Sequence, residues 1–154
     1  MYQEQVRLNA RSMKSRIADA IVERLNQVSD LVYVKFDEVR VNMADFLEHE
    51  LPACQVIDVN ETVEHEQNRA KKTWNISLEV VLKQTTYRTV NQQALWDLIY
   101  QIERKLWTFP NLLIPGVVQM VYLGNQTDLH LVDPYYVGRL DFQVVYYESL
   151  VRDC

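Results

Sequence analysis

Glycine is scarce in this sequence, and the shortage excludes several classes of enzyme. Average usage near 7% corresponds to about 11 glycines in a chain of 154 residues. This chain has three, Gly116, Gly124 and Gly138. A loop that wraps a phosphate needs several glycines, because side chains hold the backbone away from it. No GxGxxG, GxxxxGK(S/T) or GxSxG motif is present, which excludes dinucleotide-binding folds, Walker-type enzymes and nucleophile-elbow hydrolases.

Cysteine, basic charge and long apolar runs are also in short supply. Cys54 and Cys154 show no CxxC spacing, so we expect two reduced thiols in a reducing cytoplasm. The 16 basic and 21 acidic side chains give a net charge of −5, which argues against a protein that wraps nucleic acid through its phosphates. No apolar run is long enough to span a membrane, and the N-terminus lacks the apolar core of a signal peptide. No membrane contact is therefore expected.

Periodic apolar positions predict two helices and several strands. Ile17, Ile21 and Leu25 recur at helical spacing after two candidate N-caps, Ser12 and Ser15. Residues 89–92 fit a capping box that opens a second helix. Apolar residues at every second position of 72–83 predict a strand with one buried face. The expected elements are a helix over 15–29, a strand or strand pair over 31–43, a helical turn within 43–51, strands over 53–59 and 72–83, a helix ending at Trp107, and strands over 117–123 and 136–146.

This order of elements predicts an α+β fold, because it lacks the regular alternation of strand and helix in a doubly wound protein. We expect a mostly antiparallel, mixed sheet with both amphipathic helices on one face and a long charged β-hairpin or loop. Residues 1–11 are polar and are interpreted as an N-terminal arm. Residues 12–154 are expected to form one α+β domain, as the chain length favours.

The second predicted helix carries more apolar surface than docking on a sheet requires. One stripe suffices to dock the helix, and it consists of Leu95, Leu98, Ile99, Ile102 and Leu106. A second group lies beside it, namely Trp96, Tyr100 and Trp107. These aromatic residues need another partner, which is either a loop of the same chain or a neighbouring subunit.

The segment 59–72 changes charge midway between two predicted strands. From residue 41 to residue 68 there are seven acidic side chains and no lysine or arginine. The segment contains Glu61, Glu64 and Glu66, followed by Arg69, Lys71 and Lys72. One interpretation is a solvated, mobile loop, since charged runs are usually solvated. The other is a projecting hairpin whose acidic limb meets the basic limb of another copy, which would orient subunits more than it would add affinity.

Evidence for catalysis is weak in this sequence. The strongest candidate is Asp128, His130 and Asp133, because the first two side chains point the same way on an extended chain and could hold a metal. The cluster lies in a turn-rich segment, where polar residues are expected in any case. We therefore predict no catalytic residue, no bound metal and no cofactor. A small metal-dependent hydrolase and a soluble adaptor that binds through the aromatic residues of the second helix are the alternatives.

Several segments in order resemble one family of virus proteins. They are RIADAIV at 16–22, LPACQVI at 51–57, a charged hairpin, TWNISLEVVL at 73–82, a helix at 94–106, GVVQMVY at 116–122 and GRLDFQVVYY at 138–147. Together they resemble the tail terminator, or tail completion, proteins of tailed bacteriophages and their neck-region relatives. The resemblance covers about residues 13–150 and rests on element order rather than on an invariant motif.

The resemblance implies a structural virion protein rather than an enzyme. It implies a homo-oligomeric, six-fold ring that caps the tail tube and joins it to the head. The implied partners are further copies of the chain, the tail tube protein and the head–tail connector or stopper protein. DNA would pass through the lumen without specific binding, which is compatible with the acidic net charge. The implied location is the tail or neck of the virion, assembled in the host cytoplasm.

Overall fold

The computed structural model describes residues 12–36, 46–84, 91–108, 112–127 and 135–149. Their element order confirms the predicted α+β fold. The elements are α2 (Met13–Leu25), β1 (Tyr33–Phe36), the 3-10 helix η2 (Glu48–Glu50), β2 (Ala53–Glu66), β3 (Arg69–Lys83), α3 (Gln92–Trp107), β4 (Val117–Thr127) and β5 (Tyr135–Ser149).

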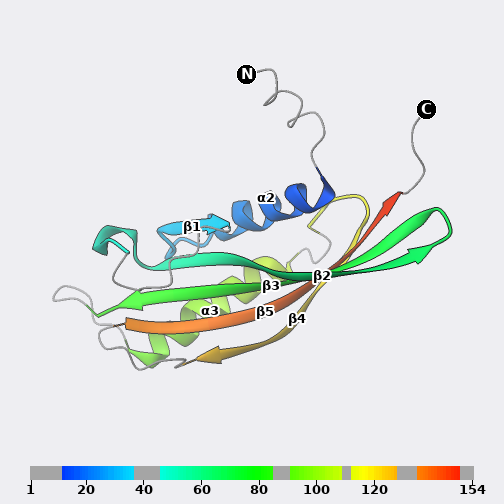
Figure 1. The fold of residues 1–154 in the computed structure, drawn as a ribbon. Coiled ribbons are helices and arrows are strands. Elements are labelled where there is room, and N and C mark those ends of the chain that lie inside the picture. Colours follow the sequence, from blue (N-terminus) through cyan, green and yellow to red (C-terminus); the bar gives the residue numbers. More distant parts are fainter. Residues whose placement is uncertain (1–11, 37–45, 85–90, 109–111, 128–134, 150–154) are drawn as a thin grey trace, which may run out of the picture.

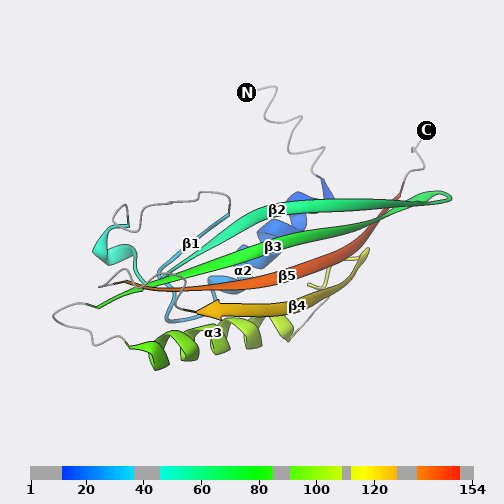
Figure 2. The same ribbon diagram turned by 60° about the horizontal axis from the view of Figure 1, so that its bottom comes forward.

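Five strands form one sheet in the order β1-β2-β3-β5-β4. The pair β1–β2 is parallel and every other pair is antiparallel, which confirms the mixed, mostly antiparallel prediction. Both α-helices lie along the same face of the sheet (Figure 1), with α3 over the β5–β4 side and α2 toward β1 and β2 (Figure 2).

The main core lies between the two helices and this sheet face. Alternate residues of β3 point into it, and Trp74, Ile76, Leu78 and Val80 are all buried there. Gly138 of β5 faces the same core. A Cβ atom at Gly138 would lie 2.9 Å from Ile99 Cδ1, so this glycine allows α3 to approach the sheet closely.

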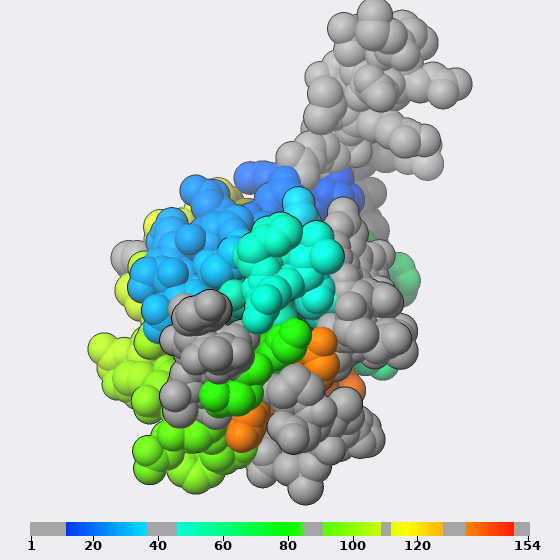
Figure 3. Space-filling view, turned by 90° about the vertical axis from the view of Figure 1, so that its left-hand side faces the viewer, coloured from blue at the N-terminus to red at the C-terminus, as the bar shows by residue number. Residues whose placement is uncertain are grey.

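The opposite sheet face is mostly polar. A small apolar cluster covers one end of it and contains Phe46, Leu51, Ala53, Val81 and Val137. Figure 3 looks onto this end of the molecule, where η2 (turquoise) lies beside the segment that leads into β1 (blue). Elsewhere the face carries hydrogen-bonded polar side chains, such as Ser77, whose hydroxyl donates to Asp141 Oδ1 over 2.6 Å. Ser77 is buried, and this bond gives its hydroxyl a partner.

Both helices begin or end at residues other than those predicted. Ser12 is the N-cap of α2, and its side chain accepts a hydrogen bond from the Ser15 backbone N–H over 3.1 Å. The helix then ends at Leu25 rather than at residue 29, although Val28 remains in the core. Helix α3 is capped by Asn91, whose side chain accepts from Ala94 N, so the predicted capping box starting at residue 89 is wrong.

The strands are longer than predicted around the charged segment. The strands β2 and β3 pair continuously up to Glu66 and Arg69, so residues 59–72 form a hairpin and the loop interpretation is wrong. Gln67 adopts a positive φ of 40° in the tight turn. Strand β4 continues through Gly124, at φ 139°, instead of ending there. Of the predicted strand over 31–43, β1 takes four residues, and 37–45 lie outside the described residues.

Candidate functional site

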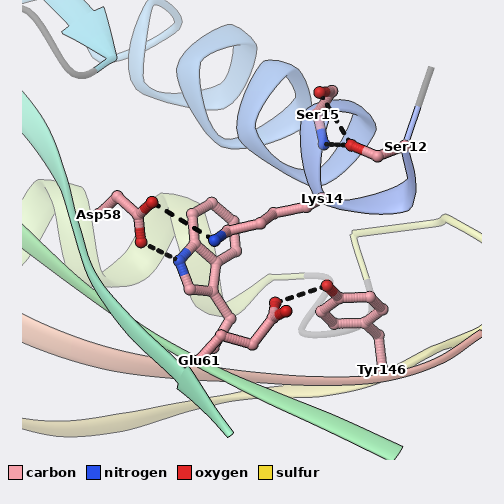
Figure 4. Close-up of polar contacts among 7 residues, drawn as sticks. Ser12, Lys14, Ser15, Asp58, Glu61 and Tyr146 are labelled. Atoms are coloured by element: carbon pink, nitrogen blue, oxygen red, sulfur yellow. Dashed lines mark hydrogen bonds and ion pairs between the residues drawn. The ribbon is translucent and has the colours of Figure 1, made fainter. Parts of the chain in front are cut away.

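The charged hairpin, residues 59–72, projects past the ends of both helices together with the end of β5 (Figure 1). Where the hairpin begins, next to residue 58, the N-terminal turn of α2 contacts the sheet. Lys14 Nζ lies 3.3 Å from Asp58 Oδ2 and 5.0 Å from the centre of the Trp74 ring, and the Trp74 indole N–H donates to Asp58 Oδ1 over 2.8 Å. Figure 4 shows this group beside the Tyr146 hydroxyl, which donates to Glu61 Oε2 over 2.6 Å. These contacts hold the start of the hairpin against α2 and β5.

Most charges of the hairpin have partners within their own chain. Arg69 lies 3.1 Å from Glu66 and also stacks 3.9 Å from the centre of the Tyr147 ring. Lys72 pairs with Glu148 of β5. Glu64 and Lys71 occupy opposite positions in the β2–β3 register. The acidic and basic limbs therefore face each other inside one hairpin, as cross-strand pairs commonly do.

The predicted aromatic group of α3 lies on the surface. Trp96 is 53% exposed, Tyr100 58% and Trp107 57%. With Glu103 they follow the spacing i, i+4, i+7 and i+11, so they form a single line along the helix. We call Trp96, Tyr100 and Trp107 the aromatic stripe. Three large exposed rings on one helix face are typical of a contact surface.

The aromatic stripe lies on the side of α3 that faces β4. Trp107 packs edge-on against Tyr122 of β4, with ring centres 6.4 Å apart. Tyr122 donates a hydrogen bond from its hydroxyl to Glu103 over 2.6 Å and stacks on Phe142. A cavity of about 360 Å³ adjoins Trp107 and is lined by Glu103, Arg104, Trp107 and Thr108. The stripe and β4 thus form one continuous surface.

Burial raises the pKa values of three groups, two of which belong to these surfaces and one to the core. The pKa of Tyr122 rises to about 12, mainly through burial and then through its hydrogen bond to Glu103. Burial, followed by the hydrogen bond to Glu61, also raises the pKa of Tyr146. The buried thiol of Cys54 has its pKa raised to about 12, so it is a poor nucleophile at neutral pH. Both tyrosines therefore act as neutral donors to carboxylates.

The predicted interface residues separate into two places in the structure. Glu61, Glu64, Glu66, Arg69, Lys71 and Lys72 all belong to the hairpin, whereas Trp96, Tyr100 and Trp107 lie along α3. Sequence reasoning missed Tyr122 and Glu103, which connect the stripe to β4. The only signal for them was the position of Tyr122 within an apolar strand pattern.

The alternative metal site cannot be located, since Asp128, His130 and Asp133 lie outside the described residues. Among the residues that are described, no group of three or more histidine, cysteine or acidic side chains could hold a metal ion. In the same part of the chain, no helix has the length and apolar character needed to cross a bilayer.

Comparison with known proteins gives a similarity of fold. No protein-family model matches the chain, and no curated protein matches it. The chain is similar to a chain in the solved structure "Virion of native gene transfer agent (GTA) particle". The two are 12% identical, with a TM-score of 0.57 over 85% of this chain and 94% of that chain. The match shows a shared fold that extends over most of both chains.

Proposed function

We propose that this chain is a structural subunit of a virion that forms a ring, caps the tail tube and joins it to the head connector. The observation that carries the proposal is the similarity of fold, over 85% of the chain, to a component of a gene transfer agent virion. The resemblance of residues 13–150 to tail terminator proteins supports the same role.

The geometry supports a ring because the molecule presents different surfaces on its two sides. The aromatic stripe lies near β4, which is at one edge of the sheet, and the charged hairpin is formed by β2 and β3, which lie toward the opposite edge. A head-to-tail contact between unlike surfaces generates a ring when the rotation closes. We propose further copies of the chain, the tail tube protein and the head–tail connector as partners, in the tail or neck of the virion.

The test is co-assembly with tail tubes grown from the tail tube protein of the same virion. We expect electron microscopy of stained samples to show ring particles and tubes of uniform length with a ring at one end. The control omits this chain, and its tubes should grow to variable lengths. Uncapped tubes together with a monomer in solution would contradict the proposal. A one-to-one complex with a cellular protein would favour the adaptor alternative.

A second measurement separates a structural role from a hydrolase. Elemental analysis of the purified chain should find no stoichiometric metal if the role is purely structural. A bound metal that is lost in Asp128→Ala and His130→Ala variants, together with a hydrolytic activity, would overturn that part of the proposal.

A further inference from the structure

We infer that neighbouring copies of this chain join edge to edge, with β4 of one copy pairing with the outer part of β2 of the next. The inference deepens the proposed ring by naming its interface, and it rests on that proposal for its biological setting.

The sheet has two long edges without a neighbouring strand among the described residues. Strand β4 is the last strand of the sheet, so its whole outer side, Val117–Thr127, is an edge. At the other end, β1 pairs only with residues 53–56 of β2. Residues 57–66 of β2 pair with β3 on one side and, among the described residues, with no strand on the other side. Such edges offer rows of backbone donors and acceptors to another strand.

The two edges lie at the same level and run in opposite directions. Strand directions alternate from β2 through β3 and β5 to β4, so β2 and β4 are antiparallel. The pairings define rows across the sheet, among them Asp58–Ile76–Phe142–Tyr122, Glu61–Trp74–Val144–Met120 and Thr62–Thr73–Val145–Gln119. Rotating a copy about an axis along the strands therefore brings its β2 edge beside β4 of its neighbour as an antiparallel pair.

The chemistry of the edges favours pairing of unlike edges. Strand β4 has no charged residue, and its Val118 and Leu123 side chains are 49% and 55% exposed. Edge strands usually carry charges that prevent such pairing, and β4 lacks them. The β2 edge contains Asp58, Glu61 and Glu64, so two β2 edges would repel each other. An acidic edge can pair with the neutral β4 edge without that repulsion.

The aromatic stripe adds apolar contact to the same pairing. It flanks β4 on the helix side of the sheet, as the Trp107–Tyr122 packing shows. A strand added to β4 would place every second side chain on this side. Glu61 of β2 pairs with Trp74, which points into the core, so Glu61 lies on the helix-covered face of the sheet. Val63 lies two residues further along β2 and therefore on the same face, and it is 46% exposed. The incoming strand therefore brings an apolar side chain to the side of the sheet that carries the exposed rings.

Disulfide trapping tests this register directly. Thr62→Cys and Gln119→Cys introduce thiols at two exposed positions of one row, in a Cys154→Ser background. Mild oxidation of the double variant should give a ladder of covalent multimers on a non-reducing gel. Equal mixing of the two single variants should stop at dimers. The control pair, Thr62→Cys with Gln126→Cys, has thiols about 23 Å apart along the edges and should stay uncrosslinked.

Three outcomes would overturn the inference. The first is efficient dimer formation by Gln119→Cys alone, which would mean that β4 pairs with β4. The second is equal trapping in the control pair. The third is measured on the unmodified protein by hydrogen exchange. We expect exchange at residues 57–63 and 117–124 to slow on assembly and exchange in β3 to stay unchanged, so a failure to slow at these two segments is the contradicting result. A ring with unprotected edges overturns the edge pairing alone, whereas a chain that stays monomeric with tail tubes overturns the ring as well.

Discussion

The charged hairpin and the aromatic stripe are both candidates for an interface, and the structure distinguishes them. In the hairpin, Arg69 and Lys72 already have acidic partners in their own chain. In the stripe, Trp96, Tyr100 and Trp107 each expose more than half of their surface. The hairpin side chains are therefore largely satisfied before any partner arrives, and the stripe is not.

This difference has an energetic consequence. Exposed ion pairs contribute about 0–1 kcal/mol each, and an exchange of partners between subunits gains little. Tryptophan and tyrosine side chains at the centre of an interface commonly contribute about 2 kcal/mol or more when they become buried. We expect the side chains of the hairpin to orient subunits and those of the stripe to supply affinity, while the backbone edges set the register.

The largest expected effect comes from the residue that connects the hairpin to the body. Trp74 is fully buried, packs against Phe36 and donates to Asp58. Trp74→Ala should lower the free energy of unfolding by about 3–5 kcal/mol, because it opens a large cavity in the core. Urea denaturation measures the change. Trp96→Ala is the matched control and should change the free energy of unfolding by no more than about 0.5 kcal/mol. Equal losses of stability in the two variants would contradict a buried Trp74 and an exposed Trp96.

The second largest effect concerns association. The double variant Trp96→Ala with Trp107→Ala should raise the dissociation constant of the oligomer at least about 30-fold, which corresponds to about 2 kcal/mol. Sedimentation over a concentration series measures it. Leu47→Ala, at a residue 58% exposed and far from the stripe in sequence, serves as the control and should assemble normally. Unchanged assembly of the double variant would remove the stripe from the interface.

A smaller effect is expected at alkaline pH. Burial raises the pKa of Tyr122 to about 12 and also raises that of Tyr146. A folded-state pKa above the unfolded value gives stability that is complete below about pH 10 and is lost as the pH rises further. The free energy of unfolding should therefore fall between pH 10 and 12.

Phenylalanine variants identify which tyrosines cause this fall. Tyr122→Phe and Tyr146→Phe should each make the decline shallower, because the ionising hydroxyl is gone. Tyr100→Phe, at an exposed ring, is the control and should leave the slope as it is in the original chain. Equal slopes in all three variants would contradict the assignment.

The smallest effect is expected in the hairpin. Glu64→Lys combined with Lys71→Glu exchanges two charges at opposite register positions, so the cross-strand arrangement is retained. Because both side chains lie on the projecting hairpin, stability should change by less than about 0.5 kcal/mol and association should be nearly unaffected. Lys71→Glu alone puts like charges opposite each other and should be the less stable of the two variants. The opposite ranking would show that these charges have other partners.

Sequence periodicity predicted those elements whose core-facing residues recur at regular spacing. Trp74, Ile76, Leu78, Val80 and Leu82 line the core at every second position of β3, although Ser77 and Val81 on its other face are also buried. The buried stripe of α3 is the predicted one. The hairpin was left open between loop and strands because its side chains are exposed on both faces, so burial leaves no pattern there. One signal was present: Glu64 and Glu66 mirror Lys71 and Arg69 about the turn, as cross-strand pairs require.

The candidate interface could be predicted only in part for a related reason. The aromatic stripe follows from helical spacing, so Trp96, Tyr100 and Trp107 were found. The edges depend on strand order, and local sequence does not specify which strand is last in a sheet. Within the described residues, β4 is an edge and β1 covers four residues of β2, and both facts follow from long-range pairing. Tyr122 was missed because its role depends on the neighbouring helix.

The most direct test of the aromatic stripe as the main source of affinity compares oligomer mass in three proteins at one concentration. These are the original chain, the Trp96→Ala/Trp107→Ala variant and the Glu64→Lys/Lys71→Glu variant, measured by mass photometry after folding has been checked by circular dichroism. We expect the original chain and the charge-exchanged variant to form the same oligomer and the tryptophan variant to be mostly monomeric. Normal assembly of the tryptophan variant, together with a monomeric charge-exchanged variant, would contradict this expectation.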